Sequence, residues 1–199
     1  RIDVNIMTAE DPVEYNLMGI NQVLVRNEVG LTFAAALKAF LRQDPNIIMI
    51  GEIRDLETGG IAIKAALTGH LVLSTLHTND APSTITRMID MGIEAFNVAS
   101  AVNLVVAQRL VRRICKNCKA PANYKAEEIA TLFPNPEAAK GIEFMKGAGC
   151  DACNGGGYKG GAGLYEVMSL SPEIRRLILR GGSVAELREQ AVTEGMLTL

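Results

Sequence analysis

The four cysteines of the chain form two Cys-x-x-Cys pairs, Cys115 with Cys118 and Cys150 with Cys153. One such pair can chelate a metal ion from a tight turn, and two pairs make a tetrahedral four-thiolate zinc site. No secretory pattern precedes them, so metal binding is favoured over disulfides. A thioredoxin-like redox role is disfavoured, because it uses a single pair beside a βαβ unit. The spacing therefore predicts one structural zinc ion.

Three predicted strands are followed by residues that can bind phosphate or transfer protons. Short strands alternating with helices predict a parallel sheet, in which ligands bind beyond the carboxyl ends of the strands. The strands predicted over 2–8, 47–50 and 71–76 deliver these residues to that edge: Glu10, Asp11 and Glu14; Glu52 and Arg54; and His77. Carboxylates, an arginine and an imidazole together predict a site for a metal-bound phosphate substrate.

Glu52 follows four apolar residues, 47–50, after a single glycine, and this run resembles a Walker B strand with its acid. An acid after a buried strand is held rigidly and is partly desolvated. Such a residue suits the task of orienting or deprotonating an attacking water. The pattern alone leaves open that Glu52 only pairs with Arg54 or begins the next helix.

The remaining candidates also have simpler interpretations. His77 could donate to a phosphate oxygen, whereas His70, just after a helix-ending glycine, is interpreted as structural. The acidic loop 10–14 could hold Mg²⁺ through water or be only solvated. The basic cluster beginning at Arg109 favours a solvated face or a subunit contact over RNA or a membrane. Three arginines could neutralise phosphate charge or only keep the surface soluble: Arg26, Arg42 and Arg54.

A P-loop of the form Gly-x-x-x-x-Gly-Lys-[Ser/Thr] does not occur in the sequence. The Walker B interpretation therefore requires a P-loop upstream of Arg1. The chain opens without a methionine, and we expect it to be part of a longer protein.

Helix signals lie between and after the predicted strands. A further strand is predicted over 20–25. N-cap residues precede helices predicted over 33–42, 56–67 and 81–91: Thr32, Asp55 and Asp80. Other helices are predicted over 94–108, near 126–132, after Ser171-Pro172, and after the capping box at Ser183. The glycine-rich stretch 147–163 is predicted to be a loop stapled by the cysteines.

Composition limits the possible class of protein. The 199 residues carry 20 basic and 22 acidic side chains, a net charge of −2, which is too near neutral for a general polyanion binder. Hydrophobic residues make up 48% and aromatic ones 5%, which predicts an aliphatic globular core. No apolar run approaches the roughly 20 residues of a membrane span. The predicted domains are an α/β core at 1–110, a tetracysteine zinc-binding subdomain at 111–165 and a C-terminal helical region at 166–199.

Three long motifs resemble those of the ATPases of the type II secretion and type IV pilus superfamily. Residues 7–15 resemble their Asp box, and 68–80 their His box. Residues 41–55 resemble their atypical Walker B, with Gly51 where many P-loop enzymes have Asp. The tetracysteine module resembles that of the assembly and export branch. The residues around 16–19 and 33–37 are most similar to pilus assembly (extension) ATPases.

The resemblance implies an α/β fold: a RecA-like P-loop NTPase core with helices on both faces of a parallel sheet, a small Cys₄ zinc-binding subdomain and C-terminal helices. It implies hydrolysis of ATP with Mg²⁺ to drive pilin assembly into a type IV pilus, with type II secretion as the alternative. It further implies a cytoplasmic homohexamer at the inner face of the bacterial inner membrane. Such a motor binds a membrane platform protein, reaches the membrane through partners and binds no nucleic acid.

The resemblance also implies roles for individual residues. Glu52 would be the catalytic glutamate and His77 the γ-phosphate sensor, both in contact with the nucleotide. The acids that would orient metal and water are Glu10, Asp11 and Glu14. The arginines that would stabilise charge at or near a subunit boundary are Arg42 and Arg54.

Two departures from the family pattern stand out. Asn46 replaces an aspartate, and Gly161 replaces a basic residue. The family's P-loop, its N-terminal domains and the last part of its C-terminal helical region are not in this sequence, so we expect the 199-residue chain alone to be inactive. An alternative of another class is a zinc-stapled, non-enzymatic binding module such as a nucleic-acid ribbon. The acidic net charge and the few aromatic residues count against it.

Overall fold

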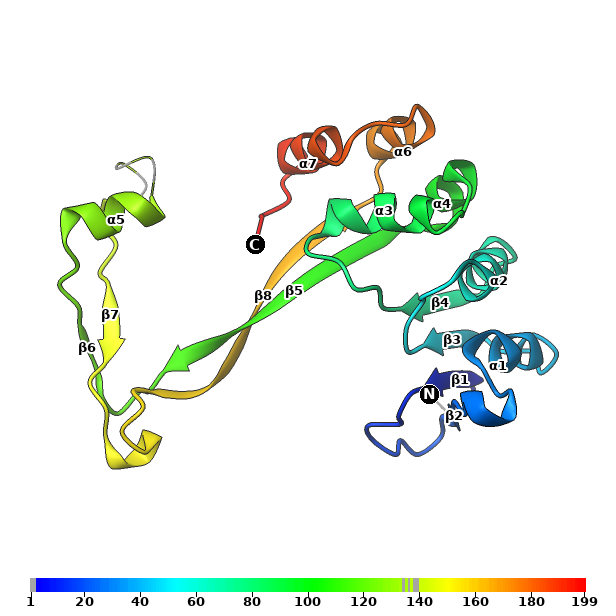
Figure 1. The fold of residues 1–199 in the computed structure, drawn as a ribbon, viewed down its shortest axis with the longest axis horizontal. Helices are drawn as coiled ribbons and strands as arrows, with labels where there is room; N and C mark the ends of the chain where they lie inside the picture. The colour runs from blue at the N-terminus through cyan, green and yellow to red at the C-terminus, as the bar shows by residue number, and fades with distance from the viewer. Residues whose placement is uncertain (1–2, 134, 136, 138–139) are drawn as a thin grey trace. The chain divides into compact units, whose positions relative to one another are not determined.

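The computed structural model describes residues 3–133, 135, 137 and 140–199 (Figure 1). The chain divides into two compact units, one formed by residues 1–107 and 165–199 and the other by 108–164. The C-terminal segment therefore packs with the N-terminal one. None of the described helices is long and apolar enough to cross a bilayer.

Four parallel strands form the sheet of the first unit, in the order β2-β1-β3-β4. They are β1 (Ile6–Glu10), β2 (Asn21–Leu24), β3 (Ile47–Ile50) and β4 (Leu71–Ser74). β1 pairs with β3 from Ile6 opposite Ile47 to Ala9 opposite Ile50, so both strands end at the same level. β3 and β4 end together in the same way, with Ile50 opposite Ser74. The residues after β1, β3 and β4 consequently meet at one edge.

Two strand predictions need correction. The strand predicted over 2–8 is displaced: β1 begins at Ile6 and continues through Glu10, and residue 2 lies outside the described part of the chain. The strand predicted over 71–76 is shorter and is not buried, with Leu71 54% and Leu73 50% exposed. β4 is an edge strand of the described sheet, and within it only Val72 is packed against the neighbouring core.

Helices α1 (Phe33–Phe40) and α2 (Leu56–Leu67) contact the strands of this sheet. Each begins as predicted, because Thr32 accepts the N–H of Ala35 and Asp55 accepts the N–H of Thr58. α1 buries Leu37 and Phe40 against Ile48 and Ile50 of β3 in a shared apolar cluster. Burial of each such side chain stabilises the fold by about 1.5–3 kcal/mol. This core fixes β3, the strand that leads to Glu52.

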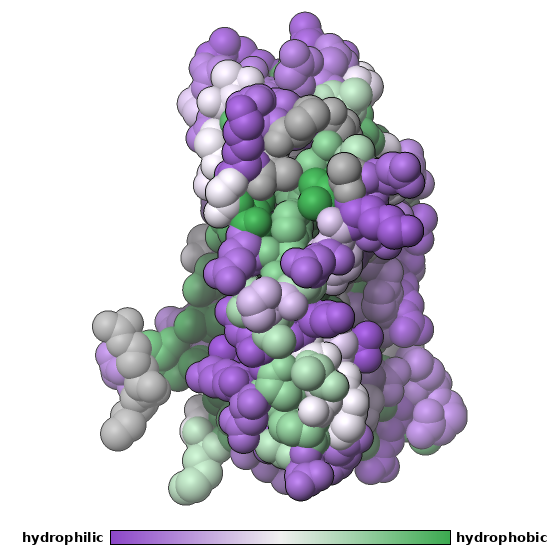
Figure 2. Space-filling view, turned by 90° about the vertical axis from the view of Figure 1, so that its left-hand side faces the viewer, coloured by the Kyte–Doolittle hydropathy of each residue, from purple (hydrophilic) through white to green (hydrophobic). Residues whose placement is uncertain are grey.

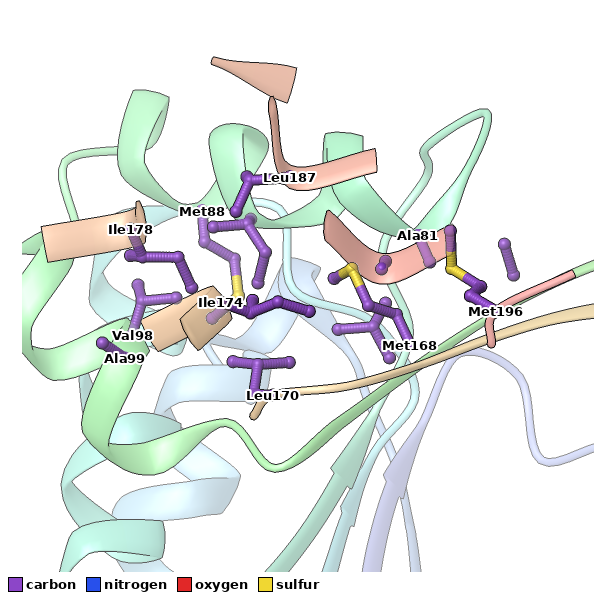
Figure 3. Packing of buried hydrophobic residues seen from close by; sticks show 14 of the residues in the cluster. Ala81, Met88, Val98, Ala99, Met168, Leu170, Ile174, Ile178, Leu187 and Met196 are labelled. Carbon is purple, nitrogen blue, oxygen red and sulfur yellow. The ribbon is translucent and has the colours of Figure 1, made fainter. Parts of the chain in front are cut away.

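A second apolar cluster joins helices from both ends of the chain (Figure 3). The helices are α3 (Ala81–Asp90), α4 (Ala95–Ala101), α6 (Pro172–Leu179) and α7 (Val184–Thr193). Ile174 and Ile178 of α6 are buried beside Val98 and Ala99 of α4 (Figure 3). The predicted starts of α6 and α7 are confirmed, since Ser171 and Ser183 both cap their helices.

The prediction of a helix over 94–108 is wrong in its second half. α4 ends at Ala101, and β5 (Leu104–Ile114) follows. Along β5, Val105 and Ala107 are buried while Leu104 and Val106 are exposed, the two-residue period of a strand. The stretch 147–163 also contains more than a loop, because β8 (Tyr158–Ser169) begins within it and pairs with β5.

The second unit contains β6 (Lys119–Pro121), α5 (Ala126–Leu132) and β7 (Met145–Gly147). β6 and β7 pair antiparallel, and the short 3-10 turn Asp151–Cys153 follows. Of the side chains between 108 and 164 whose burial is described, Cys115 is the only buried hydrophobic one. On the face drawn in Figure 2, hydrophobic residues form a band between hydrophilic ones. A unit with so few buried hydrophobic side chains is typical of those that need a metal or disulfides for stability.

Candidate functional site

A pocket of about 410 Å³ lies at the carboxyl ends of β1, β3 and β4. It is lined by both acidic and basic groups, together with small and apolar residues of the strand ends. The sequence-predicted residues that line it are Glu10, Asp11, Glu14, Glu52, Arg54 and His77. Six of the seven predicted catalytic residues therefore come together. Arg42, the seventh, is exposed beyond the end of α1 and does not belong to the lining.

Glu52 stands at the centre of this pocket's polar groups. Its side chain is only 11% exposed, whereas the side chains of Arg54 and His77 are 69% and 85% exposed. Glu52 Oε2 lies 2.6 Å from Arg54 Nε and 3.2 Å from His77 Nε2. The ion pair with Arg54, one of the simpler interpretations of this glutamate, is thus present. Glu52 does not begin the next helix, since α2 starts at Leu56.

The segment carrying His77 is tied to the segment carrying Glu52. Thr75 Oγ1 donates to the carbonyl oxygen of Gly51 at 2.6 Å, and the N–H of Ile53 donates to the carbonyl of Thr75 at 3.0 Å. These two bonds extend the β3–β4 pairing past the strand ends. They bring Glu52 and His77 within contact distance.

The close approach of β1 favours glycine at position 51. A Cβ atom at this position would lie 3.2 Å from the carbonyl oxygen of Ala9, tighter than an ordinary contact. The Gly51 N–H already donates to that same oxygen at 2.8 Å. A larger residue would push β3 away from β1 and shift Glu52 relative to Glu10.

Glu10 is held by two side chains that the sequence did not suggest. Its Oε1 accepts hydrogen bonds from Thr8 Oγ1 at 2.6 Å and from Gln22 Nε2 at 2.9 Å. These two bonds keep the pKa of the Glu10 carboxyl below its usual value. Glu10 is therefore ionised. Asp11 and Glu14 lie on the following loop and are more exposed than Glu10. Three carboxylates at one side of the pocket make a suitable environment for a hydrated divalent cation.

Some contacts of the site could not be found from sequence patterns. Thr8 sits inside β1 and is buried, and Gln22 lies 12 positions from Glu10. Thr75 reaches Gly51 across 24 positions. The bonds of Gln22 and Thr75 depend on the register between strands, which no local spacing reveals, whereas Thr8 and Glu10 lie two positions apart on one face of β1.

Asn46 has a structural role in place of the expected carboxylate. Its Oδ1 accepts the N–H of Asn5 at 2.7 Å, and its own N–H donates to the Asn5 carbonyl at 2.9 Å. The pair joins the start of β1 to the start of β3. At Gly161, a Cβ atom would meet nothing closer than the carbonyl of Val111 at 3.7 Å, so a side chain would fit there.

The four cysteines form a compact cluster in the second unit. All four sulfur atoms lie within 4.8 Å of one another, and the thiols are free. The individual Sγ–Sγ distances are 3.9 Å for Cys115–Cys150, 3.8 Å for Cys118–Cys153 and 3.7 Å for Cys150–Cys153. A tetrahedral zinc ion with Zn–S bonds of about 2.3 Å separates its sulfur ligands by about 3.8 Å. The donor set therefore fits a zinc ion.

Backbone groups support these thiols. The N–H groups of Cys150 and Gly157 point at Cys153 Sγ, at 3.3 and 3.2 Å. These contacts lower the pKa of the Cys153 thiol to about 7, which favours the thiolate that a metal needs. A Cβ atom at Gly147 would lie 1.9 Å from the carbonyl oxygen of Gly157, so only glycine permits this approach. The Gly157 carbonyl also accepts the N–H of Cys115 at 2.9 Å.

A parallel α/β sheet with an acid two residues after an inner strand and a pocket at the carboxyl ends of its strands is the arrangement of ligand-binding α/β folds. The whole chain, residues 1–199, matches the family described as Type II/IV secretion system protein. The chain belongs to that family. The predicted fold class, a RecA-like α/β core with a tetracysteine unit, is confirmed.

Several characterised proteins are similar to this chain. It is 52% identical over its full length to the type IV pilus assembly ATPase PilB of Myxococcus xanthus and 55% identical over 98% of its length to PilB of Acinetobacter baylyi. It is 50% identical over 98% of its length to the type II secretion system protein HxcR of Pseudomonas aeruginosa. The chain spans about a third of the length of these relatives, 34–38%.

A solved structure agrees with the fold. The pilus retraction motor PilT with bound ADP superimposes with a TM-score of 0.59 at 27% identity, covering 98% of this chain and 50% of that one. The ATPase DotB of Legionella pneumophila superimposes with a TM-score of 0.62 at 22% identity, over 98% of this chain and 45% of that one. The latter likeness bears on the fold alone.

Proposed function

We propose that this chain is the catalytic part of an ATPase motor that drives pilin assembly into a type IV pilus. The observation that carries the proposal is the placement of Glu52, nearly buried in a pocket with three other carboxylates and in contact with Arg54 and His77. The similarity to pilus assembly ATPases over the full chain supports it. In the complete protein, the motor acts as a homohexamer at the cytoplasmic face of the inner membrane, bound to a membrane platform protein.

The chemistry assigned to the pocket follows from its charges. Glu52 accepts the proton of an attacking water or orients that water, which a carboxylate held by its contacts with Arg54 and His77 can do without moving. Glu10, Asp11 and Glu14 would hold hydrated Mg²⁺, which would neutralise phosphate charge. Arg54 and His77 offer positive or polar contacts to phosphate oxygens. Arg42 lies outside this pocket and stabilises charge at the boundary with a neighbouring subunit in this proposal.

The cysteine cluster is proposed to hold one structural Zn²⁺. The four ligands are Cys115, Cys118, Cys150 and Cys153. The ion supplies folding energy to a unit that has almost no buried apolar core of its own. It has no part in hydrolysis in this proposal.

Measurement of ATP hydrolysis by the complete protein with Mg²⁺ tests the proposal. We expect steady phosphate release from the wild type and a loss of at least about a hundredfold in kcat for Glu52→Gln, with ATP binding retained. Glu57→Gln is the matched control. Glu57 is an exposed acid on α2 whose described ion pair is with Lys38, away from the pocket lining. Turnover by Glu52→Gln within about threefold of wild type would show that Glu52 is structural.

A second candidate function is the export of folded proteins by a type II secretion machine. The similarity to HxcR, 50% over nearly the whole chain, favours it. Complementation separates the two functions. The gene restores pili in a strain without its pilus assembly ATPase under the first proposal, and restores secretion in a strain without its secretion ATPase under the second. A non-enzymatic zinc module is disfavoured by the family match over residues 1–199.

A further inference from the structure

A buried carboxylate outside the pocket binds the start of helix α3. Glu166 lies on β8 and is 0% exposed. Its Oε1 accepts the backbone N–H of Ala81 at 2.7 Å, and its Oε2 accepts the N–H of Leu199 at 3.3 Å. Burial of a carboxylate is strongly unfavourable unless such donors surround it. The two backbone N–H groups therefore offset part of the cost of burying the Glu166 side chain.

Glu166 contacts the first turn of α3. Ala81 is its first residue, Pro82 has no N–H, and the N–H of Ser83 donates to Asp80 Oδ1 at 2.8 Å. Glu166 and Asp80 together thus satisfy the donors of residues 81–83. The positive end of the helix dipole favours both carboxylates at this place. Ala81 lies toward the same end of the apolar cluster as Met196 (Figure 3).

Arg188 of α7 forms a second link to the same turn. Its Nη2 lies 2.7 Å from Asp80 Oδ2. Burial acts to raise the pKa of Asp80, but hydrogen bonds from Ser83 and Arg188 outweigh it and the pKa is lowered. Asp80 is therefore an ionised partner for Arg188. The C-terminal segment holds the turn at two neighbouring residues, Asp80 and Ala81.

His77 lies between this turn and the anchor at Thr75. Upstream, Thr75 is bonded to Gly51 and Ile53. Downstream, Asp80 and Ala81 are held by the C-terminal segment. The His77 side chain itself is 85% exposed, so packing alone does not direct it toward Glu52. Its direction must come from the backbone on either side.

We propose that Glu166 is a positioning residue for His77. By fixing the N-terminus of α3, it fixes the backbone of residues 77–80 and so places His77 Nε2 against Glu52 Oε2. Arg188 contributes through Asp80. The effect on turnover rests on the proposed ATPase function, whereas the effect on the segment 77–80 does not.

Hydrogen exchange of the complete protein, read by mass spectrometry, tests the placement. Glu166→Gln keeps the side chain's shape but removes its charge and one acceptor. We expect the amides of 78–84 to exchange about tenfold faster, as when a hydrogen bond to a charged group is replaced by a weaker one to a neutral amide. Arg188→Met, at a side chain that is 40% exposed and tolerant of change, gives a smaller increase in the same peptides. The control is Arg175→Met, because Arg175 contacts Ala99, Leu170 and Asn103 instead.

A double-mutant cycle tests whether Glu166 acts through His77. We expect Glu166→Gln to lower kcat for ATP about tenfold with KM within about twofold. In a His77→Ala background, the same change lowers kcat by less than about twofold, because the group being positioned is gone. A merely structural role gives the same loss in both backgrounds. Arg188→Lys, which keeps the charge, recovers part of the activity lost in Arg188→Met.

The outcomes separate the two proposals. Unchanged exchange over 78–84 in both Glu166→Gln and Arg188→Met overturns the positioning role, and so do additive losses in the cycle. If the wild-type protein hydrolyses no ATP, the proposed function is overturned. If Glu166→Gln still exchanges faster than that wild type over 78–84, the placement of the segment by Glu166 is supported.

Discussion

His77 Nε2 lies 3.2 Å from Glu52 Oε2, although the two residues follow different strands and are 25 positions apart. The exposed imidazole touches a carboxylate that is almost fully buried. A phosphate that binds the exposed imidazole would compete with Glu52 for it. The contact between His77 and Glu52 can therefore couple the binding of phosphate to the state of the buried acid.

We expect His77→Ala to lower ATP turnover by the complete protein, by about tenfold and less than Glu52→Gln does. The glutamate remains oriented by Arg54, so the chemical step survives in part. Steady-state kinetics measure the loss. His70→Ala is the control, because His70 Nδ1 lies 3.0 Å from the carbonyl of Ala65 at the end of α2, away from the pocket lining. Equal losses of ATP turnover in the two variants would show that His77 has no specific role in the site.

We expect about one zinc ion per chain by elemental analysis, with four thiolate ligands. Cys150→Ser removes one ligand and should unfold residues 108–164 while leaving the first unit folded, since each unit has its own contacts. Limited proteolysis of the variant, and of wild type treated with a chelator, measures this. A metal-free chain whose second unit resists proteolysis as well as the zinc-loaded form would contradict the assignment.

We expect the 199-residue chain by itself to bind Mg-ATP very weakly and to release no measurable phosphate. Nucleotide binding in P-loop proteins rests on the N–H groups and lysine of the glycine-rich loop, and the sequence holds no such motif. The acids that line the pocket repel a nucleotide without its cations. Calorimetric titration of the purified chain is the measurement. Micromolar binding or steady hydrolysis would mean that other groups, such as Arg42 of a neighbouring copy, replace the loop.

Local sequence signals predicted those parts of the fold that depend on neighbouring residues. N-caps at Thr32, Asp55 and Asp80 located three helices, since a cap is a short-range interaction. The helix prediction for 94–108 is wrong because its apolar residues suit both the helical and the strand period. Pairing with β8 decides that the second half is the strand β5.

The candidate site shows the same division. The position of Glu52 after β3 followed from the chain, because an acid after an aliphatic run is a local pattern. The exclusion of Arg42 from the pocket and the bond from Glu166 to Ala81, across 85 positions, depend on tertiary packing. No spacing in the sequence carries that information.

The pH dependence of stability should reveal the bonds that hold Glu10. The folded-state pKa of Glu10 is lowered, first by the hydrogen bond from Thr8. A lowered pKa contributes stability above the ordinary value of 4.5, and that contribution is lost as the pH falls through the lowered folded-state value. Thr8→Val removes the donor from a buried position and shifts the folded-state pKa back upward. At neutral pH it should reduce the free energy of unfolding by on the order of 1 kcal/mol, because Glu10 remains partly solvated.

Urea unfolding of wild type and Thr8→Val, repeated from neutral to acidic pH, measures this difference. We expect it to be largest at neutral pH and to shrink once Glu10 is protonated in both folded proteins. Glu10→Gln provides the control background, in which the same substitution should give a difference that does not vary with pH. A Thr8→Val difference that is constant with pH while Glu10 is intact would show that Thr8 stabilises β1 by packing alone. The acidic side of the pocket would then be held by Gln22.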